Sequence, residues 1–471
     1  MHYDHIILIS LDTLRSDCIA SNPFKLWPER YPSLVPPRTP VLDAFAASGA
    51  FFPNAISAAP YTSASHGTYL TGQYPLRHGV FEFYGGRISS PTLFTYAKAA
   101  GRATIATVDF PIILGEQLGF TRDIDHYMIE DDTGFIDAVL EARTSLSFAH
   151  FGGIHVPYGF HKLKFGGDEY RRTVEQMESE LPRDLAIHLD ELTETYRGEE
   201  DVRIFLRYKR ALHYFYETGQ YTRMFDLYLR GLEFFLETRF APFLDRLESG
   251  LRAAGRSYLI VLFGDHGHEF SKSSFGNFNS FSEGVVRVPV IFKADDVAPG
   301  MFSERIRTAD VMPTIMELAG MRPDADHRPD GVSLASVLRE GTAPPADAVA
   351  LCQCYTADAN DFVAYQRRQL AGDSPEPIRH VKLFELAYLG NQRVLRRSHE
   401  YSTNFDRLLL VDEPVLVEQF DADLKPVADP DGEPTEALSL LKAYNATYRP
   451  AARVIAAGDT RRGLRNMGYR V

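Results

Sequence analysis

The chain has 471 residues, of which 45% are hydrophobic and 12% aromatic, so it can bury a large core and is too long for one small domain. A formal net charge of -13 at pH 7 argues against general nucleic-acid binding, although a metal and a few local cations could still attract an anionic substrate. Its three cysteines, Cys18, Cys352 and Cys354, exclude a disulfide framework, and no apolar run reaches the length of a membrane span.

Residues 4–11, DHIILISL, predict a buried β-strand that ends at Asp12. The carboxyl ends of strands are where α/β enzymes gather their ligands and catalytic groups, so Asp12 is a candidate metal ligand. The alternative is that Asp12 caps the segment that follows. The residues before the strand contain no basic segment, so we expect no secretory signal and a cytoplasmic protein.

A group of small hydroxyl residues follows a strand predicted at 51–57. In the stretch 61–80, YTSASHGTYLTGQYPLRHGV, Ser65 to Leu70 predict the first turns of a short helix, so Thr62 lies near a helix N-terminus. The backbone amides there favour an anion and lower the cost of forming an alkoxide. The alternative is that these hydroxyl groups only cap the helix.

The middle of the chain alternates helix and strand and then becomes strongly charged. A strand predicted at 145–151 carries His150, and His155 follows in a loop after two glycines, where it is the stronger functional candidate of the two. Either histidine could instead be a structural hydrogen-bonding group. Residues 160–225 predict a solvated, charged helical insertion that shapes a pocket rim or an oligomer contact, and the sequence does not choose between these.

The most informative stretch is YLIVLFGDHGHEF, residues 258–270. Its apolar run predicts a buried strand near the centre of a parallel sheet, followed at once by Asp265 and His266. Glycines on either side let the chain turn, so that both side chains converge at the end of the strand. The alternative is a polar turn after a core strand.

Further strands and helices complete the predicted α/β fold. Pro289, within the strand predicted at 285–293, indicates an edge strand or a bulge. Beyond about residue 348 the pattern changes to short strands separated by turns and then a helix, which predicts a small antiparallel subdomain. We therefore expect a catalytic domain over residues 1–347 and an α+β subdomain over residues 348–471.

The candidate residues combine into a metal site with a nucleophile. Asp12, Asp265 and His266 suit a divalent cation, for which Mn²⁺ is favoured and Zn²⁺, Ca²⁺ and Mg²⁺ are alternatives. A Thr62 hydroxyl that touches this cation loses its proton more readily and can attack phosphorus or sulfur. The residues expected to bind the oxygens of the substrate or to protonate the leaving group are His66, His155, Lys272 and Asn277.

Several motifs, spread along the chain in order, support this combination. They are ILISLDTLRSD at 7–17, TSASHGTYLTGQYPLRHGV at 62–80, HVPY at 155–158, FGDHG at 263–267, EGVVRVPVIF at 283–292, ADVMPTIMELAG at 309–320, DGVSL at 330–334 and LRNMGY at 464–469. Together they resemble the sulfatase family within the alkaline phosphatase superfamily. The resemblance implies a large mixed, mainly parallel sheet sandwiched by helices, with a smaller C-terminal antiparallel subdomain.

The resemblance implies roles for Asp12, Thr62, Asp265, His266 and His155, and the other site residues named below are expected from their chemistry alone. The implied metal ligands are Asp12, Thr62, Asp265 and His266. The residues expected to act in catalysis are Thr62 as the nucleophile, His155 on the substrate side, and His66. The residues expected to contact the substrate are Arg15, His150, Lys272 and Asn277.

The chain departs from the sulfatase pattern at three places. Sulfatases carry Cys-x-Pro-x-Arg, or Ser at the first position, and oxidise that residue to formylglycine; here residues 62–66 are Thr-Ser-Ala-Ser-His, so formylglycine cannot form by the usual route. Thr13 stands where a second carboxylate would follow the first, which favours one metal over two, although His150 or His268 could complete a second site. Asn277 stands where relatives often have the histidine of a Gly-His-Gly loop.

A threonine nucleophile resembles the phosphodiesterase and phosphoethanolamine-transferase branches of this superfamily. We therefore expect a metal-dependent hydrolase that cleaves phosphodiesters or phosphonate monoesters through a covalent intermediate on Thr62. The alternatives are a transferase that uses the same threonine, a sulfate ester hydrolase without formylglycine, and an inactive relative that serves as a scaffold. The expected partner is a small anionic ester, with no nucleic acid and no membrane span, and the sequence leaves a homo-oligomer open.

Overall fold

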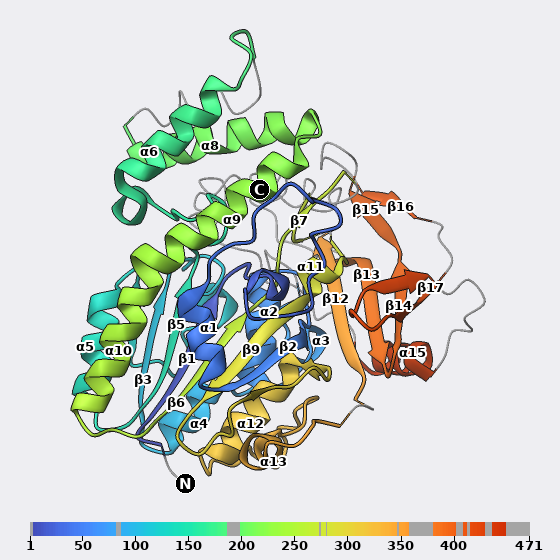
Figure 1. Cartoon of the computed structure of the whole chain (residues 1–471). Helices are drawn as coiled ribbons and strands as arrows, with labels where there is room; N and C mark the ends of the chain where they lie inside the picture. Colours follow the sequence, from blue (N-terminus) through green and yellow to red (C-terminus); the bar gives the residue numbers. More distant parts are fainter. Residues whose placement is uncertain are drawn as a thin grey trace, which may run out of the picture.

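Figure 1 shows the computed structural model of the chain, which describes most of the sequence. The described residues are 3–81, 86–185, 198–272, 275–278, 280–345, 348–357, 380–401, 408–411, 415–428 and 436–448. The motif LRNMGY at 464–469 therefore lies outside the described residues, as do residues 346–347, where the boundary between the two expected domains falls. That boundary stays a prediction.

A nine-stranded sheet forms the centre of the molecule (Figure 1). Its order is β10-β2-β9-β6-β1-β5-β3-β4, and β11 also pairs with β2. The strands are β1 (His5–Leu11), β2 (Ala50–Ile56), β3 (Ala103–Val108), β4 (His126–Ile129), β5 (Ser145–Phe151), β6 (Tyr258–Gly264), β9 (Arg287–Lys293), β10 (Gly300–Met301) and β11 (Ile306–Arg307). Strands β6, β1, β5, β3 and β4 run parallel, whereas β9 is antiparallel to both of its neighbours. The prediction of a mixed, mainly parallel sheet is confirmed.

The register of the central strands brings their polar ends together. Leu11 of β1 lies opposite Gly264 of β6 on one side and opposite Phe151 of β5 on the other. Because parallel strands that are in register end at the same edge of a sheet, the residues that follow them meet there. Asp12 directly follows β1 and Asp265 directly follows β6, so the register of the two strands places these residues side by side.

Strand β9 lies inside the sheet, between β2 and β6, so the prediction of an edge strand for Pro289 is wrong. Proline is excluded from most interior strands because it has no N–H to donate to the ladder. Here the ladder between β2 and β9 shifts register between Phe52 and Ala55, next to Pro289. The irregularity that the sequence indicated is present, and it is what lets an interior strand carry a proline.

Helices cover both faces of this sheet. Side chains alternate along β1, so Ile7 and Ile9 join one buried cluster and Ile6 and Leu8 join another. The first cluster includes residues of α1 (Pro40–Ala47), α5 (Asp132–Glu141), α9 (Tyr221–Phe235) and α10 (Ala241–Ala253). The second includes residues of α2 (Thr62–Thr71), α4 (Leu93–Ala99), α12 (Val311–Leu318) and α13 (Ala335–Glu340). Shorter helices are α3 (Pro75–His78) and α11 (Glu283–Val286).

The charged region at 160–225 forms helices that pack onto the rest of the molecule. These are α6 (Leu163–Ser179), α8 (Glu200–Glu217) and the beginning of α9. Tyr170 of α6 and Tyr208 of α8 belong to the same buried cluster as the central strands. Charged groups such as Arg207 and Glu178 pair with each other nearer the surface. The insertion is therefore amphipathic, with an inner face that is part of the core.

A separate antiparallel sheet forms in the C-terminal region, as predicted. Its order is β12-β13-β14-β17-β18, with strands β12 (Ala350–Ala357), β13 (His380–Leu389), β14 (Gln392–Arg397), β17 (Leu416–Phe420) and β18 (Pro426–Ala428). Helix α15 (Glu436–Thr447) packs beside β13 and β14. Two-stranded pairs are β7 (Glu269–Phe270) with β8 (Phe275–Gly276), and β15 (His399–Tyr401) with β16 (Leu408–Leu410).

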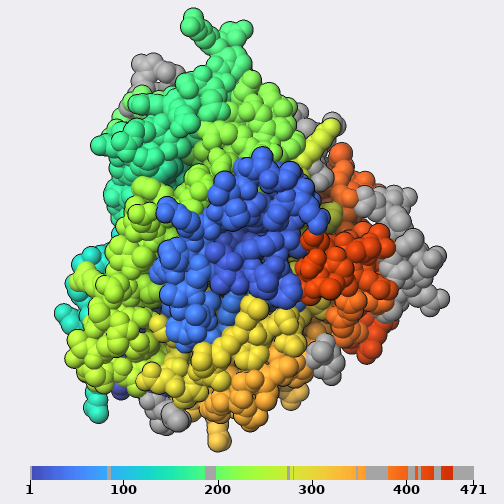
Figure 2. All heavy atoms as spheres, viewed as in Figure 1, coloured from blue at the N-terminus to red at the C-terminus, as the bar shows by residue number. Residues whose placement is uncertain are grey.

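The N-terminal residues (blue) fill the middle of one face of the molecule, between atoms coloured green and the C-terminal atoms coloured red (Figure 2). Within the part of the chain that the structure describes, no helix is both long and apolar enough to cross a membrane.

Candidate metal centre and nucleophile

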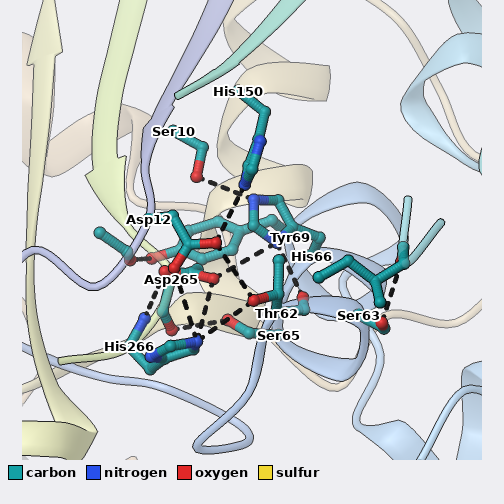
Figure 3. A network of polar contacts seen from close by, with 12 residues as sticks. Ser10, Asp12, Thr62, Ser63, Ser65, His66, Tyr69, His150, Asp265 and His266 are labelled. Atoms are coloured by element: carbon teal, nitrogen blue, oxygen red, sulfur yellow. Dashed lines mark hydrogen bonds and ion pairs between the residues drawn. The ribbon is translucent and has the colours of Figure 1, made fainter. Parts of the chain in front are cut away.

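Three potential metal ligands meet where β1 and β6 end. One ligand atom each from Asp12, Asp265 and His266 lies within 4.8 Å of the others, and all three residues are fully buried. Figure 3 shows their side chains pointing toward one another and toward Thr62. The sequence predicted this convergence from the two strand ends.

Hydrogen bonds fix one oxygen of each carboxylate. Asp265 Oδ1 accepts from the backbone N–H of Thr13 at 3.0 Å and from that of His266 at 2.8 Å. Asp12 Oδ2 lies 3.2 Å from His150 Nε2 and accepts from Thr62 Oγ1 at 3.3 Å. The other two oxygens, Asp12 Oδ1 and Asp265 Oδ2, have no hydrogen-bond partner among the described residues. Buried carboxylate oxygens without a donor suit a cation, so the residues present fit a divalent metal.

Electrostatics support the same conclusion. Burial alone would raise the pKa of Asp12, but the hydrogen bond with His150 and the charges of nearby histidines hold it below its usual range. Burial and the negative charge of Asp12 raise the pKa of Asp265. Two carboxylates this close repel each other when both are ionised. A divalent cation between them would remove that repulsion and let both carry their charge.

Thr62 is the first residue of α2, which begins three residues earlier than the sequence predicted. Its Oγ1 lies 3.3 Å from Asp12 Oδ2 and 3.3 Å from His266 Nε2. The N–H groups of the first helical turn have no acceptor within the helix, so this end of α2 favours negative charge. The hydroxyl thus touches the candidate metal ligands and sits where an oxyanion would be stabilised.

His66 lies behind Thr62 and is fully buried. Its Nδ1 is 2.8 Å from the carbonyl oxygen of Thr62, and its Nε2 is 2.8 Å from the hydroxyl of Ser10. Burial and the charge of His150 lower the pKa of His66 to about 3, so the ring is neutral at pH 7. Nδ1–H then donates to the carbonyl and Nε2 accepts from the hydroxyl. These contacts hold the start of α2, whereas the catalytic role expected for His66 stays a prediction.

Three further candidates lie next to the cluster. His150 contacts Asp12 directly, and Asn277 Nδ2 lies 3.3 Å from His266 Nε2 while donating to Pro60 O at 2.9 Å. His155 is half-buried, and its Nδ1 lies 3.0 Å from Val156 O. Burial lowers the pKa of His155, and the charge of Asp12 opposes that shift.

The structure does not bring the two predicted cationic residues to the cluster. The guanidinium of Arg15 is buried, forms a two-point ion pair with Asp17 and donates to the carbonyl oxygen of His268 at 2.8 Å. Lys272 is exposed, and no contact described here joins it to the cluster. Their substrate-binding roles stay predictions without a geometric counterpart.

Two residues, one in the helical insertion and one in the part of helix α9 that follows it, approach the site and were not identified from the sequence. Lys209 of α8 acts electrostatically on His155, and burial lowers the pKa of Lys209 to about 8. Tyr228 of α9 is fully buried and hydrogen-bonds the chain that follows Asp12. Helical periodicity predicts which face of a helix is buried, but it does not tell which buried residue reaches a distant site.

The N-terminal part of the chain is similar to a known protein family. The model of the sulfatase family matches residues 4–111, which include Asp12 and Thr62. No curated protein sequence matches the chain.

Solved structures of similar fold extend the likeness over nearly the whole chain. One, of a protein in complex with its substrate D-glucosamine-2-N,6-O-disulfate, has a TM-score of 0.60 at 15% identity and covers 95% of this chain and 98% of its own. The phosphonate monoester hydrolase of Agrobacterium radiobacter has a TM-score of 0.59 at 15% identity, with 94% and 95% covered. The phosphonate monoester hydrolase of Silicibacter pomeroyi has a TM-score of 0.56 at 16% identity, with 94% of each chain covered.

At these identities the structures establish the fold, and the family match covers the segment that carries Asp12, a candidate ligand, and Thr62, the candidate nucleophile. Sequence motif, family match and fold point to the same group of proteins. Over residues 4–111 the chain is similar to the sulfatase family, and in fold it is similar to phosphonate monoester hydrolases.

Proposed function

We propose that the protein is a metal-dependent hydrolase of phosphate esters, acting on phosphodiesters or phosphonate monoesters, with Thr62 as its nucleophile. The observation that carries this proposal is the position of Thr62 Oγ1, 3.3 Å from both Asp12 Oδ2 and His266 Nε2 at the start of α2. A hydroxyl in that position can be deprotonated and aimed at an electrophile bound by the same cluster.

Asp12, Asp265 and His266 would hold the cation, which when bound supplies positive charge that stabilises the reacting oxygens. In the first half of the reaction Thr62 Oγ1 forms a bond to phosphorus, the bond from phosphorus to the leaving alcohol breaks, and the Thr62 proton leaves with the alcohol. The N-terminal turn of α2 stabilises the oxyanion that develops beside it.

The second half of the reaction regenerates Thr62. Water attacks the phosphorus of the phosphorylated threonine, the bond to Oγ1 breaks, and the proton of the water passes to Oγ1. His155 is suited to carry that proton, because burial keeps its ring neutral and its Nδ1 is bonded to Val156 O, which leaves Nε2 as the accepting nitrogen.

Residue 62 favours phosphorus over sulfur as the electrophile. A threonine at this position cannot become formylglycine by the route that sulfatases use, whereas a threonine hydroxyl can form a phosphoester. The phosphonate monoester hydrolases of similar fold support this class of substrate. Another structure of similar fold was solved with a sulfated sugar, so sulfate esters are the alternative to test.

The test is turnover of bis-p-nitrophenyl phosphate, p-nitrophenyl phosphate, a phenylphosphonate ester and p-nitrophenyl sulfate. Each is measured after chelation and again after addition of Mn²⁺, Zn²⁺, Mg²⁺ or Ca²⁺. We expect metal-dependent cleavage of the diester or the phosphonate, a loss of about 10³-fold or more in Thr62→Ala, and substantial retention in Thr62→Ser. Cleavage of the sulfate alone, or equal rates in wild type and Thr62→Ala, would overturn the proposal.

A further inference from the structure

Helix α9 reaches the site through a single buried hydroxyl. Tyr228 OH donates to the carbonyl oxygen of Thr13 at 2.8 Å and accepts from the backbone N–H of Arg15 at 3.1 Å. Burial raises the pKa of Tyr228, so the hydroxyl keeps the proton that it donates. One side chain therefore bridges the peptide groups on either side of Leu14, the first of which carries the carbonyl group of Thr13.

The residue before Leu14 has an unusual backbone conformation. Thr13 has a φ of 61°, in the left-handed region that β-branched residues avoid. A conformation of this kind persists only when the surrounding structure imposes it. The two hydrogen bonds of Tyr228 flank Leu14, and the first of them fixes the carbonyl group of Thr13, on the C-terminal side of the strained residue.

The conformation of Thr13 has a direct consequence for the metal ligands. Its N–H points at Asp265 Oδ1 and donates to it at 3.0 Å. Together with the bond from the His266 N–H, this fixes the carboxylate so that Asp265 Oδ2 faces the cluster, 3.4 Å from His266 Nε2. If Thr13 relaxed to an ordinary conformation, its N–H would turn away and Asp265 would lose one of its two orienting donors.

Packing contacts on both sides of Tyr228 fix the position of helix α9 relative to the site. Phe225, one turn before Tyr228, stacks on Phe270 with ring centroids 4.9 Å apart and lies under the guanidinium of Arg15 at 5.1 Å. Gly231, three residues after Tyr228, packs directly against the backbone of Tyr158. The hydroxyl thus projects from a helix that is anchored on both sides of it.

From these contacts we propose that Tyr228 is a positioning residue for the metal centre: it holds Thr13 in the left-handed conformation that orients Asp265 for the cation. The inference rests on the metal site of the proposed function. If so, a residue of helix α9, which lies outside the segment matched by the family model, determines part of the metal affinity. Residues that orient metal ligands commonly change affinity by about 10- to 100-fold when they are removed.

The experiment measures Mn²⁺ binding to the full-length, chelator-stripped protein by calorimetric titration, without reference to activity. We expect Tyr228→Phe, which deletes only the hydroxyl, to bind Mn²⁺ about 10-fold or more weakly than wild type. The matched control is Tyr170→Phe, because Tyr170 is a fully buried tyrosine of α6 whose hydroxyl has no hydrogen-bond partner among the described residues. Tyr170→Phe should bind Mn²⁺ as wild type does.

A second variant separates positioning from general destabilisation. Glycine adopts a φ near 60° without strain, so Thr13→Gly needs no hydrogen bond from Tyr228 to keep the N–H of residue 13 on Asp265. We expect Thr13→Gly combined with Tyr228→Phe to restore Mn²⁺ affinity to within about 3-fold of wild type.

The outcomes are distinct. Equal Mn²⁺ affinities of Tyr228→Phe and Tyr170→Phe, or a double variant as weak as Tyr228→Phe alone, would overturn the inference while the metal site stands. A wild-type protein that binds neither Mn²⁺ nor Zn²⁺, Mg²⁺ or Ca²⁺ would overturn the proposed function, and this inference with it.

Discussion

At the level of single residues, the site brings two buried carboxylates together before any cation binds. Asp12 and Asp265 each have one oxygen without a hydrogen-bond donor among the described residues, and the pKa of Asp265 is raised by burial and by Asp12. A raised carboxyl pKa means that ionising Asp265 costs more free energy in the folded protein than in the unfolded chain. A divalent cation held by both carboxylates would remove this cost.

The first prediction concerns Asp265→Asn. The amide oxygen can still accept from the N–H groups of Thr13 and His266, while the repulsion with Asp12 disappears. We expect the chelated variant to be more stable than chelated wild type by about 1–2 kcal/mol, because one unit of pKa shift corresponds to about 1.4 kcal/mol. Added Mn²⁺ should raise the melting temperature of wild type and leave that of the variant unchanged. Equal stabilisation of both proteins by Mn²⁺ would contradict the assignment of Asp265 as a ligand.

The convergence of the three candidate ligands could be predicted from sequence for a simple physical reason. Asp12, Asp265 and His266 directly follow apolar strands, and the carboxyl ends of parallel strands share one edge of a sheet. Thr13 and Tyr228 could not be predicted, because a contact between residues 215 positions apart leaves no periodic pattern. The ion pair of Arg15 with Asp17 could not be predicted either, and the substrate-binding role expected for Arg15 stays a prediction.

At the level of elements, helix α9 lies directly on the loop that carries His155. A Cβ atom added at Gly231 would lie 2.5 Å from the carbonyl carbon of Tyr158 and 2.6 Å from its oxygen. These are backbone atoms, which cannot swing aside as the end of a side chain can. The helix and the loop therefore approach as closely as they do because residue 231 has no side chain.

The second prediction follows from that contact. Gly231→Ala should lower the free energy of unfolding by about 1–3 kcal/mol through overpacking, even though alanine is the better helix former. It should also reduce turnover, because the loop that carries His155 must shift. The control is Gly300→Ala, whose added Cβ would meet only ring atoms of Phe302 at 3.8 Å. Equal stability of the two variants would contradict this packing.

A buried ion pair joins strand β3 to the π-helical turn at Leu236–Phe240. Asp109, at the end of β3, accepts two hydrogen bonds from Arg239 and one from the N–H of Gly152. Burial would raise the pKa of Asp109, but the charges of His161 and Arg239 lower it to about 2. The pair thus stabilises the end of the strand as long as Asp109 is ionised.

The third prediction is the pH dependence of this pair. The pKa of Asp109 is lower in the folded state than the ordinary 3.8, so its contribution is fully present above pH 4 and is lost as the pH falls toward 2. The difference corresponds to roughly 2 kcal/mol. Asp109→Asn should be less stable at pH 7 and lose less stability on acidification, measured by denaturant unfolding in chelator. The control is Asp168→Asn, because Asp168 is exposed, and its free energy of unfolding should change with pH as that of wild type does. If the free energy of unfolding of Asp109→Asn fell with pH as steeply as that of wild type, the stabilising role of this pair would be contradicted.

Most elements could be predicted from the periodicity of apolar residues, including β1, β5, β6, α1 and α12. The interior position of β9 could not be predicted. The rule that places proline on edge strands assumes an unbroken ladder of hydrogen bonds, whereas here the ladder is broken by a register shift in the neighbouring strand β2, which the sequence of β9 does not reveal. The insertion was expected to be solvated from its charge, yet Tyr170 and Tyr208 are buried in the main core. Charge density reports the outer face of a helix and says nothing of the inner one.

At the level of the whole molecule, a buried network joins the C-terminal sheet to the central sheet. Glu283, just before β9, pairs with Arg287 and with Arg393 of β14, each at 2.6 Å, and accepts from Tyr388 of β13 at 2.8 Å. Arg393 also binds Glu418 of β17. The strands of the smaller sheet therefore share charged groups with the element that precedes β9.

The fourth prediction tests this junction. Arg393→Met would leave Glu418 without its described partner and remove one of two arginines from Glu283, and both carboxylates are buried. Breaking a buried pair from one side typically costs about 3–5 kcal/mol. The control is Arg396→Met on the same strand, whose arginine is 33% exposed and lies 3.7 Å from Glu385, and we expect a loss below about 1 kcal/mol. If denaturant unfolding showed that Arg393→Met and Arg396→Met lose the same free energy of unfolding, the stabilising role of this network would be contradicted.

The central claim is that Thr62 forms a covalent bond to phosphorus. The most direct test is to mix Mn²⁺-loaded protein with bis-p-nitrophenyl phosphate or the phenylphosphonate ester, quench in acid within the first turnovers, and map the adduct by peptide mass spectrometry. We predict a phosphoryl or phosphonyl group on Thr62 in wild type, and neither adduct nor turnover in Thr62→Ala. An adduct on another residue, or turnover by Thr62→Ala at the wild-type rate, would contradict the claim.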